Sequence, residues 1–406
     1  MSERAPQAAR GNAIGPALAM TFLVQVLMAL PVGAASVLTV TITQAIGVAP
    51  SMLGVYVSIM WIGALLAVPY SGNVLTWCGP VRALQLCLVL TAAGGLLLAS
   101  GIVPLIALGS FLMGVAVGPE VPFSMQLLSR ITTPRQRPFV VSVKSTGWQA
   151  GMAALGLSAP ILTAALGWQG CIAVYSLGNL ALAIAQEPLR RRYDADHGRQ
   201  PGRRASVWLS IRAVLRSVDL VRLTLATVIL ALALNAFMSF MVSQLTIELG
   251  YGLALAGSVY ACGQVGAVAG RLVGGLAAGR WIAPWPFLIL VGLFIAATSI
   301  ALGSAQAAWP VAAVAAIAAL TGAAGASWLG VALSEVSRCA PPDEVGLVTG
   351  GVLFFFYLTL ILAPIGFASA AAHFGYGWAF IGVGVITVLG MGLLLLMPRS
   401  SDAPPP

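Results

Sequence analysis

Glu120 and Lys144 are the side chains best placed to do chemistry in this chain. Glu120 precedes Arg130 by ten residues, which is roughly 15 Å along a helix at 1.5 Å per residue. A carboxylate that deep in a bilayer costs on the order of 3 kcal/mol unless it is paired or protonated, and Pro119 and Pro122 open the helix around it. We interpret Glu120 as an acid that carries a proton or positions a ligand. A packed protonated acid or a fixed ion pair is the structural alternative.

Lys144 is the only lysine of the chain and lies roughly 10 Å along the helix from the preceding arginine. Trp148 follows one turn later on the same helix face, and Gly147 and Gly151 leave the rest of that stripe smooth. A lysine above an aromatic ring at a cavity wall would bind an anion, and we expect it to pair with Glu120 when no anion is bound. Alternatively, the flexible lysine stem snorkels to the membrane surface.

Arg271 is a third charge within an apolar segment, nine residues before Arg280. A glycine stands at every fourth position from Gly266 to Gly274, a pattern that lets another helix approach closely. We expect that helix to be the fifth or the eleventh span. A charge in so tight a groove needs a carboxylate or carbonyl partner, for which Glu335 is a candidate. Arg271 is interpreted as a structural latch or, alternatively, as a substrate contact.

The composition explains why these charges are unusual. The chain has 406 residues, of which 59% are hydrophobic and only 8% charged, against roughly 25% charged residues in a soluble domain. Three stretches, 11–81, 281–334 and 345–398, contain no formal charge. One helical crossing needs about 20 apolar residues, so each stretch holds two crossings and a turn. The pattern predicts an all-α integral membrane protein with twelve spans in six hairpins.

The positive charge lies in the gaps between hairpins. The net charge is +9, but the positive-inside rule accounts for it, so it does not indicate a nucleic-acid partner. Glu248 is the only formal charge in a predicted outer turn. We therefore expect both termini to be cytoplasmic and the protein to lie in the cell inner membrane. The first apolar run is too long for a cleaved signal and is expected to be a retained helix.

The spans can be placed from the apolar runs and turn residues. The first is expected to kink or end near Pro31, and a turn at 166–170 separates the fifth from the sixth. Three parts are predicted: an N-terminal six-helix bundle at 1–188, a basic cytoplasmic linker with an amphipathic surface helix at 189–218, and a C-terminal six-helix bundle at 219–406. The twelve predicted spans cover 13–42, 51–71, 81–99, 105–128, 139–166, 168–186, 221–247, 253–278, 285–302, 311–335, 345–371 and 377–397.

The two halves of the chain repeat one another at an offset of 203 residues. Gly63-Ala64 recurs as Gly266-Ala267, and Gly72 recurs as Gly275. Thr146-Gly147 at the start of the fifth span recurs as Thr349-Gly350 at the start of the eleventh. One offset shared by two pairs of spans favours duplication of a six-span unit. Parallel repeats of this kind are typical of transporters that rock one half against the other.

The chain resembles the major facilitator superfamily over essentially its full length. The motif of that family between the second and third spans, Gly-x-x-x-Asp-Arg-x-Gly-Arg-Arg, corresponds here to Gly72–Arg82, where only glycines and a displaced arginine remain. The second copy, Gly270–Arg280, keeps its first and last residues but has Gly279 where Asp is usual. Gly72, Gly275, Arg271 and Arg280 are therefore predicted to be gating or structural residues, without the usual cytoplasmic ion pair.

The fifth span is similar to a narrower branch of that family. Lys144-Ser145-Thr146-Gly147 resembles the Lys-x-Thr-Gly of cyanate-transporter-like proteins. That branch handles small anions and assorted organic compounds. The Gly-Pro-x-x-Gly-Gly of drug/proton antiporters is absent, which lowers the odds of a drug pump.

The resemblance implies that spans 1, 4, 7 and 10 line a central cavity. Polar or aromatic residues at suitable depth are Gln25, Glu120, Asn235 and Trp328. The sequence thus predicts a secondary transporter for a small organic or inorganic anion, with Lys144, Trp148, Gln25, Asn235 and Trp328 as substrate-binding residues and Glu120 as the proton-coupling residue.

Other functions remain open at this point. Efflux of a neutral or cationic drug-like compound is the nearest alternative, and a transporter-derived membrane sensor is a second. No cluster of catalytic side chains or phosphate-binding loop indicates an enzyme, and no metal site or cofactor is expected. The predicted partners are a small-molecule substrate, protons and the lipid bilayer, with a monomer as the expected state.

Overall fold

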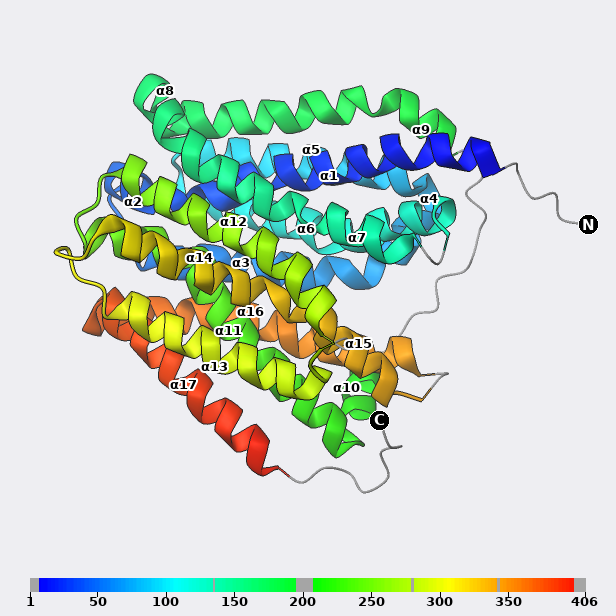
Figure 1. Cartoon of the computed structure of the whole chain (residues 1–406). Helices are drawn as coiled ribbons and strands as arrows, with labels where there is room; N and C mark the ends of the chain where they lie inside the picture. The colour runs from blue at the N-terminus through cyan, green and yellow to red at the C-terminus, as the bar shows by residue number, and fades with distance from the viewer. Residues whose placement is uncertain (1–6, 134–135, 195–206, 279–280, 342–343, 398–406) are drawn as a thin grey trace, which may run out of the picture. The chain divides into compact units, whose positions relative to one another are not determined.

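The computed structural model describes residues 7–133, 136–194, 207–278, 281–341 and 344–397. These residues are almost entirely helical (Figure 1). The helices are α1 (Gln7–Val37), α2 (Thr39–Ile46), α3 (Met52–Ala67), the 3₁₀ helix η1 (Val68–Tyr70), α4 (Ser71–Cys78), α5 (Pro80–Ala99), α6 (Val103–Ile131), α7 (Arg137–Ser145), α8 (Gly147–Ala185), α9 (Glu187–Tyr193), α10 (Val207–Leu215), α11 (Val218–Ile247), α12 (Leu253–Ala277), α13 (Pro284–Gly303), α14 (Val311–Ser327), α15 (Leu329–Cys339), α16 (Val345–Phe374) and α17 (Tyr376–Leu396).

Within the described residues, eleven segments are long and apolar enough to cross a membrane. The longest, Val140–Arg190, has 51 residues, more than twice the number that spans a bilayer. It is interrupted at Gly167, whose φ of 72° and ψ of 170° lie outside the helical region and are easily adopted only by glycine. The break separates two crossings, so the segments make twelve spans, and it falls within the turn predicted at 166–170.

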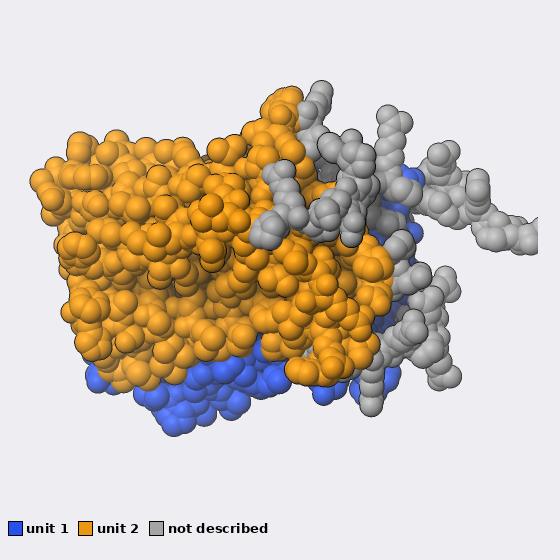
Figure 2. All heavy atoms as spheres, turned by 90° about the horizontal axis from the view of Figure 1, so that it is seen from below, with its two compact units in different colours: residues 1–47, 59–203 blue, residues 48–58, 204–406 orange. Residues whose placement is uncertain are grey.

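The chain divides into two compact units, coloured separately in Figure 2. The first contains residues 1–47 and 59–203, and the second contains 48–58 and 204–406. The division in the middle of the chain falls between residues 203 and 204, inside the predicted linker. The short 48–58 segment groups with the second unit, where the side chain of Ser58 donates a hydrogen bond to the carbonyl of Ile361 on α16.

In the first unit, α8 packs along α1, and α5 packs between α6 and α8. Glycines allow close approach at both contacts. A Cβ on Gly94 of α5 would lie 2.6 Å from the carbonyl oxygen of Gly109 on α6. A Cβ on Gly147 of α8 would lie 2.7 Å from the carbonyl oxygen of Phe22 on α1. The interior includes a buried apolar cluster with Met28 and Phe123 among its members.

In the second unit, α12 packs closely along α14. Gly266 and Gly270 of α12 lie directly against the backbones of Ala319 and Ala323 of α14. The glycine stripe beside Arg271 therefore meets the tenth span, and the prediction that it meets the fifth or eleventh span is wrong. The four-residue spacing of the glycines indicated a close helix contact. The partner helix is determined by small residues on α14 that repeat with the same four-residue spacing.

The same pair of spans meets in both units. Gly63 of α3 lies against the backbone of Phe111 on α6. Gly266, 203 residues later, lies against Ala319 on α14. A glycine of the second span thus contacts the fourth, and its repeat in the eighth contacts the tenth. This shared role supports duplication of a six-span unit.

The first span continues as a helix past Pro31 and ends at Val37. A proline removes one backbone donor and leaves the carbonyl four residues earlier without its helical partner. That carbonyl belongs to Leu27, and it accepts a hydrogen bond of 2.8 Å from the side-chain amide of Asn179 on α8. The expected break near Pro31 is therefore displaced to Leu38, because a neighbouring helix satisfies the freed group.

Candidate functional site

Glu120, Lys144 and Gln25 come from three helices of the first unit. Glu120 lies within α6, between two prolines of that helix. Lys144 is in the last turn of α7, just before the turn at Thr146 that separates α7 from α8. Gln25 lies on α1. The sequence placed each residue at plausible depth, and the fold brings the three side chains together.

The Lys144 ammonium and the Glu120 carboxylate form a buried ion pair. Nζ lies 2.9 Å from Oε1 and donates a hydrogen bond of 3.1 Å to Oε2. The amide nitrogen of Gln25 donates a second bond of 3.1 Å to Oε2. The Lys144 and Glu120 side chains are only 1% and 5% exposed. The pairing expected from the sequence is therefore present, and the snorkelling alternative for Lys144 does not apply.

Close packing of α8 on α1 positions Gln25. Gly147 and Gly151 both face α1, and a Cβ at Gly147 would lie 3.1 Å from the Cβ of Gln25. These glycines form a helix-packing surface, so their interpretation as a smooth cavity wall is wrong. Trp148 is partly buried and packs against the apolar cluster that contains Phe123. The aromatic ring thus borders the core of the unit.

The electrostatics of the pair constrain its chemistry. Charges in a low-dielectric interior interact strongly, and removal of one partner from a buried pair costs about 3–5 kcal/mol. Neither Glu120 nor Lys144 can therefore remain charged and alone. The pair can open only if an anion takes the place of the carboxylate or if the carboxylate gains a proton.

Asn235 and Trp328 belong to the second unit. Asn235 is buried on α11, and its side-chain oxygen has no hydrogen-bond partner among the described residues. Trp328 lies at the break between α14 and α15 and is fully buried, and within the same part of the chain its indole nitrogen also lacks a hydrogen-bond partner. The ring centroid of Phe356 lies 6.4 Å from that of Trp328. Buried polar atoms are usually satisfied, and here the Asn235 oxygen can accept a hydrogen bond whereas the Trp328 indole nitrogen can donate one.

Comparison with known proteins identifies the family. The sequence matches the Major Facilitator Superfamily over residues 21–334, more than half of the chain. The chain belongs to the Major Facilitator Superfamily. It is therefore a multi-pass membrane transporter and not an enzyme. A comparison with curated proteins gave no match.

Solved structures of this superfamily share its fold. A bacterial homologue of the human lysosomal transporter Spinster aligns with a TM-score of 0.72 at 15% identity, covering 97% of each chain. A D-xylose–proton symporter aligns with a TM-score of 0.73 at 14% identity, covering 96% of this chain and 98% of the symporter. A POT family transporter in complex with a thioalcohol-conjugated peptide aligns at 0.73 and 12% identity, with 93% and 95% covered.

The first superfamily motif, Gly72–Arg82, is stabilised by acids that sequence reasoning missed. Asp194, after α9, accepts hydrogen bonds of 3.0 Å from the backbone nitrogens of Val81 and Arg82 at the start of α5. The guanidinium of Arg82 lies 3.6 Å from Glu187 of α9. Asp194 was overlooked because it follows a run of arginines in a predicted linker, where a solvated acid is the ordinary interpretation.

The second motif copy, Gly270–Arg280, is described only in part. Arg271 and Gly275 lie on α12, whereas Arg280 lies outside the described residues. Glu335, suggested as a partner for Arg271, forms an ion pair of 2.8 Å with Arg338. In the first motif, a Cβ at Gly72 would meet no atom of the described residues within 4 Å, so Gly72 marks no close crossing with a described helix.

Arg222 is a buried charge that sequence reasoning did not single out. Its guanidinium lies 4.4 Å from the ring centroid of Trp285, and Nη2 donates a hydrogen bond of 3.1 Å to the carbonyl of Leu394. Asp219 lies 3.7 Å away on the preceding turn. The contacts of Arg222 join α11, α13 and α17. In the sequence, the Asp-x-x-Arg spacing of Asp219 and Arg222 was the signal that could have indicated a paired arginine. Among the described residues, no group of three or more His, Cys, Asp or Glu could hold a metal.

Proposed function

We propose that this protein is a secondary active transporter that moves a small organic or inorganic anion together with a proton. The observation that carries the proposal is the buried Lys144–Glu120 pair with Gln25 bonded to the same carboxylate. Lys144 binds the anionic group of the substrate, and Glu120 carries the coupled proton. Trp148, Asn235 and Trp328 are proposed as further substrate contacts, and Arg271, Gly72, Gly275 and Arg280 as gating or structural residues.

Coupling follows from charge balance at the pair. In the empty site, one ammonium and one carboxylate sum to zero. An anion that binds Lys144 displaces Glu120, whose carboxylate is then an unpaired buried charge unless it takes a proton. With both anion and proton bound, the site is again neutral. The states with only the anion or only the proton bound carry a net charge in a low-dielectric interior. The transporter therefore changes conformation mainly in its two neutral states, empty or with both bound.

The resemblance of Lys144-Ser145-Thr146-Gly147 to the cyanate-transporter-like branch supports a small anion as substrate. One lysine balances one negative charge, so a monovalent anion fits best. The arginine-rich gaps favour an inner-membrane location with both termini cytoplasmic. We further propose that 1–188 and 219–406 are the functional halves, joined by the 189–218 linker, in a monomer without a cofactor.

The test is uptake by purified protein in liposomes, with cyanate and small monocarboxylates as substrates. An acidic exterior should drive accumulation, and collapse of the proton gradient should abolish it. Glu120→Gln should keep exchange of anion for anion but lose proton-driven accumulation. Glu187→Gln, which removes a carboxylate outside the pair, should behave like the parent. Proton-driven accumulation in Glu120→Gln, or parental rates in both Lys144→Ala and Lys144→Arg, would contradict the proposal.

Efflux of a neutral or cationic drug-like compound is the main competing function, with Glu120 as the partner of a cation. It would require Glu120 to bind the cation, but that carboxylate is already 2.9 Å from the Lys144 ammonium. A cation would have to approach a lysine of like charge, so the geometry favours the anion. Everted vesicles that accumulate a cationic dye, without accumulation of any anion, would establish the alternative. A membrane sensor would show no uptake in liposomes.

A further inference from the structure

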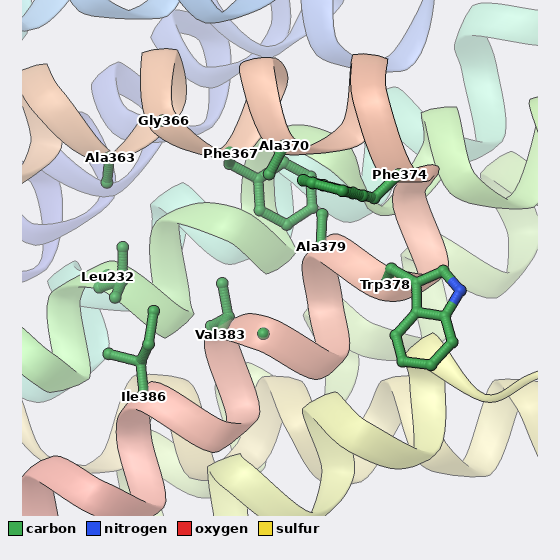
Figure 3. A pocket seen from close by; sticks show the side chains of 11 residues that line it. Leu232, Ala363, Gly366, Phe367, Ala370, Phe374, Trp378, Ala379, Val383 and Ile386 are labelled. Atoms are coloured by element: carbon green, nitrogen blue, oxygen red, sulfur yellow. The ribbon is translucent and has the colours of Figure 1, made fainter.

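The second unit has an apolar groove between α11, α16 and α17 that the proposed transport site does not use. Its volume is about 690 Å³ (Figure 3). The groove exists because small residues line it on both helices. These are Ala363, Gly366 and Ala370 on α16, and Ala379 and Gly382 on α17. A Cβ added at Gly366 or Gly382 would meet no atom within 4 Å. The groove is therefore open space bounded by two helix faces.

The floor of the groove is formed by a tightly packed aromatic residue, and two exposed aromatic residues lie at one end. Phe367 is buried, with ring centroids 4.5 Å from Phe240 and 4.9 Å from Phe380. Phe374 and Trp378 lie together at one end of the groove (Figure 3) and are 72% and 68% exposed. That end adjoins the turn at which α16 finishes and α17 begins. Exposed aromatic rings at a span end are typical of the membrane–water interface.

The chemistry of the lining excludes water and ionic ligands. The side chains that line the groove are hydrocarbon except for the indole nitrogen of Trp378. Water and ions find no hydrogen-bond partner on this hydrocarbon surface, and an anion would also lose its hydration. The occupant must therefore be apolar where it contacts the protein.

The surroundings and the length of the groove indicate the occupant. Leu362 and Ile365 of α16 and Leu389 and Leu393 of α17 are further exposed apolar residues of the same two candidate spans, so we expect lipid to contact these helices beside the groove. Its lining on α16 runs over eleven residue steps, roughly 16 Å at 1.5 Å per residue. The hydrocarbon core of a bilayer is about 30 Å thick, so the groove has the length of one leaflet.

We propose that this groove binds one acyl chain of a membrane phospholipid, with the headgroup at the end marked by Phe374 and Trp378. The chain lies along α16 and α17, over the floor formed by Phe367. This site is separate from the Lys144–Glu120 pair and does not depend on the cargo assigned to that pair.

The test is native mass spectrometry of the full-length protein after delipidation, with titration of a dioleoyl phospholipid. The parent should show one saturable, tight binding event. Gly366→Leu and Gly382→Leu fill the groove from opposite helices. Displacement of even two methylenes from the groove should weaken that event roughly tenfold. Gly392→Leu is the matched control, because Gly392 also lies on α17, is open to an added Cβ and is not part of the lining.

The outcomes are distinct. Weakening of the tight event by about tenfold or more in both filling variants, with parental binding in Gly392→Leu, supports the site. Equal lipid binding in all four proteins would overturn it. So would a parent that is dimeric by light scattering and becomes monomeric on groove filling with lipid binding unchanged, because the groove would then be an interface between two copies. The two substitutions are on different helices, so each checks the other for folding.

Discussion

Gly147 of α8 lies against the turn of α1 that carries Gln25. A Cβ at position 147 would be 2.7 Å from the carbonyl oxygen of Phe22 and 3.1 Å from the Cβ of Gln25. This contact sets how far α1 stands from α8, and it thereby holds the Gln25 amide 3.1 Å from Oε2 of Glu120. A residue without a side chain thus sets how closely the Gln25 amide approaches the Glu120 carboxylate.

The substitution Gly147→Ala should separate Gln25 from Glu120. Its methyl group meets backbone, which cannot rotate away, so α1 must shift. We expect a loss of stability of about 1–3 kcal/mol, as is typical of overpacking, and reduced uptake although Lys144 and Glu120 are unchanged. Gly178→Ala, in the crossing of α8 that follows the Gly167 break, is the control, since its nearest neighbour lies 4.0 Å away. Thermal unfolding and liposome uptake measure the two effects, and equal behaviour of both variants would refute the prediction.

A double-mutant cycle should show strong coupling between Lys144 and Glu120. Lys144→Met leaves a buried carboxylate and Glu120→Gln leaves a buried ammonium, so each single variant should lose up to about 3–5 kcal/mol. The double variant has no unpaired charge and should recover most of that loss. Additive losses measured by thermal unfolding would show that the two charges are independent.

Most of the fold could be predicted from the sequence, because membrane crossings require long uncharged apolar segments that are easily recognised. Long uncharged runs, turn glycines and arginine clusters indicated twelve spans, and Gly167 separates two crossings inside one continuous apolar segment. The depth of Glu120 could also be predicted, because the 47 residues between Arg82 and Arg130 hold two spans and a tight turn. The sequence left open whether Lys144 is buried or snorkels to the membrane surface. Their pairing followed from opposite charges at similar depth.

Contacts between distant segments could not be predicted in the same way. The glycines beside Arg271 indicated close packing, but any helix with small residues could have been the partner. Pro31 indicated a break, but the amide that relieves it, Asn179, lies 148 residues later in the sequence. Asp194 became recognisable as a helix cap only when the start of α5 was placed beside it. Such relationships depend on tertiary packing and leave no local pattern.

Loss of the Asp194 carboxylate should destabilise the first unit. It accepts two backbone hydrogen bonds at the N-terminus of α5, where donors lack helical partners. Asp194→Ala should therefore cost about 1–2 kcal/mol, as is typical for a lost N-cap. Glu187→Gln removes solvent-exposed ion pairs with Arg82 and Arg190 and should cost less stability than Asp194→Ala. Chemical or thermal unfolding in detergent compares the two, and a larger loss in Glu187→Gln would contradict the capping role.

Three glycine-to-alanine substitutions in the second unit should rank by what the new methyl group meets. At Gly270 it meets the backbone of Ala323, which cannot move without separating α12 from α14. At Gly274 the nearest atom is the side-chain Cβ of Ser327, 2.6 Å away, and at Gly330 nothing lies within 4 Å. We expect Gly270→Ala to lose the most stability, about 1–3 kcal/mol, with a smaller loss for Gly274→Ala. Gly330→Ala should be neutral or slightly stabilising, because alanine favours the helix. Thermal unfolding of the three proteins beside the parent measures the order, and a Gly330→Ala variant as unstable as Gly270→Ala would show that the α12–α14 contact does not limit the stability of this unit.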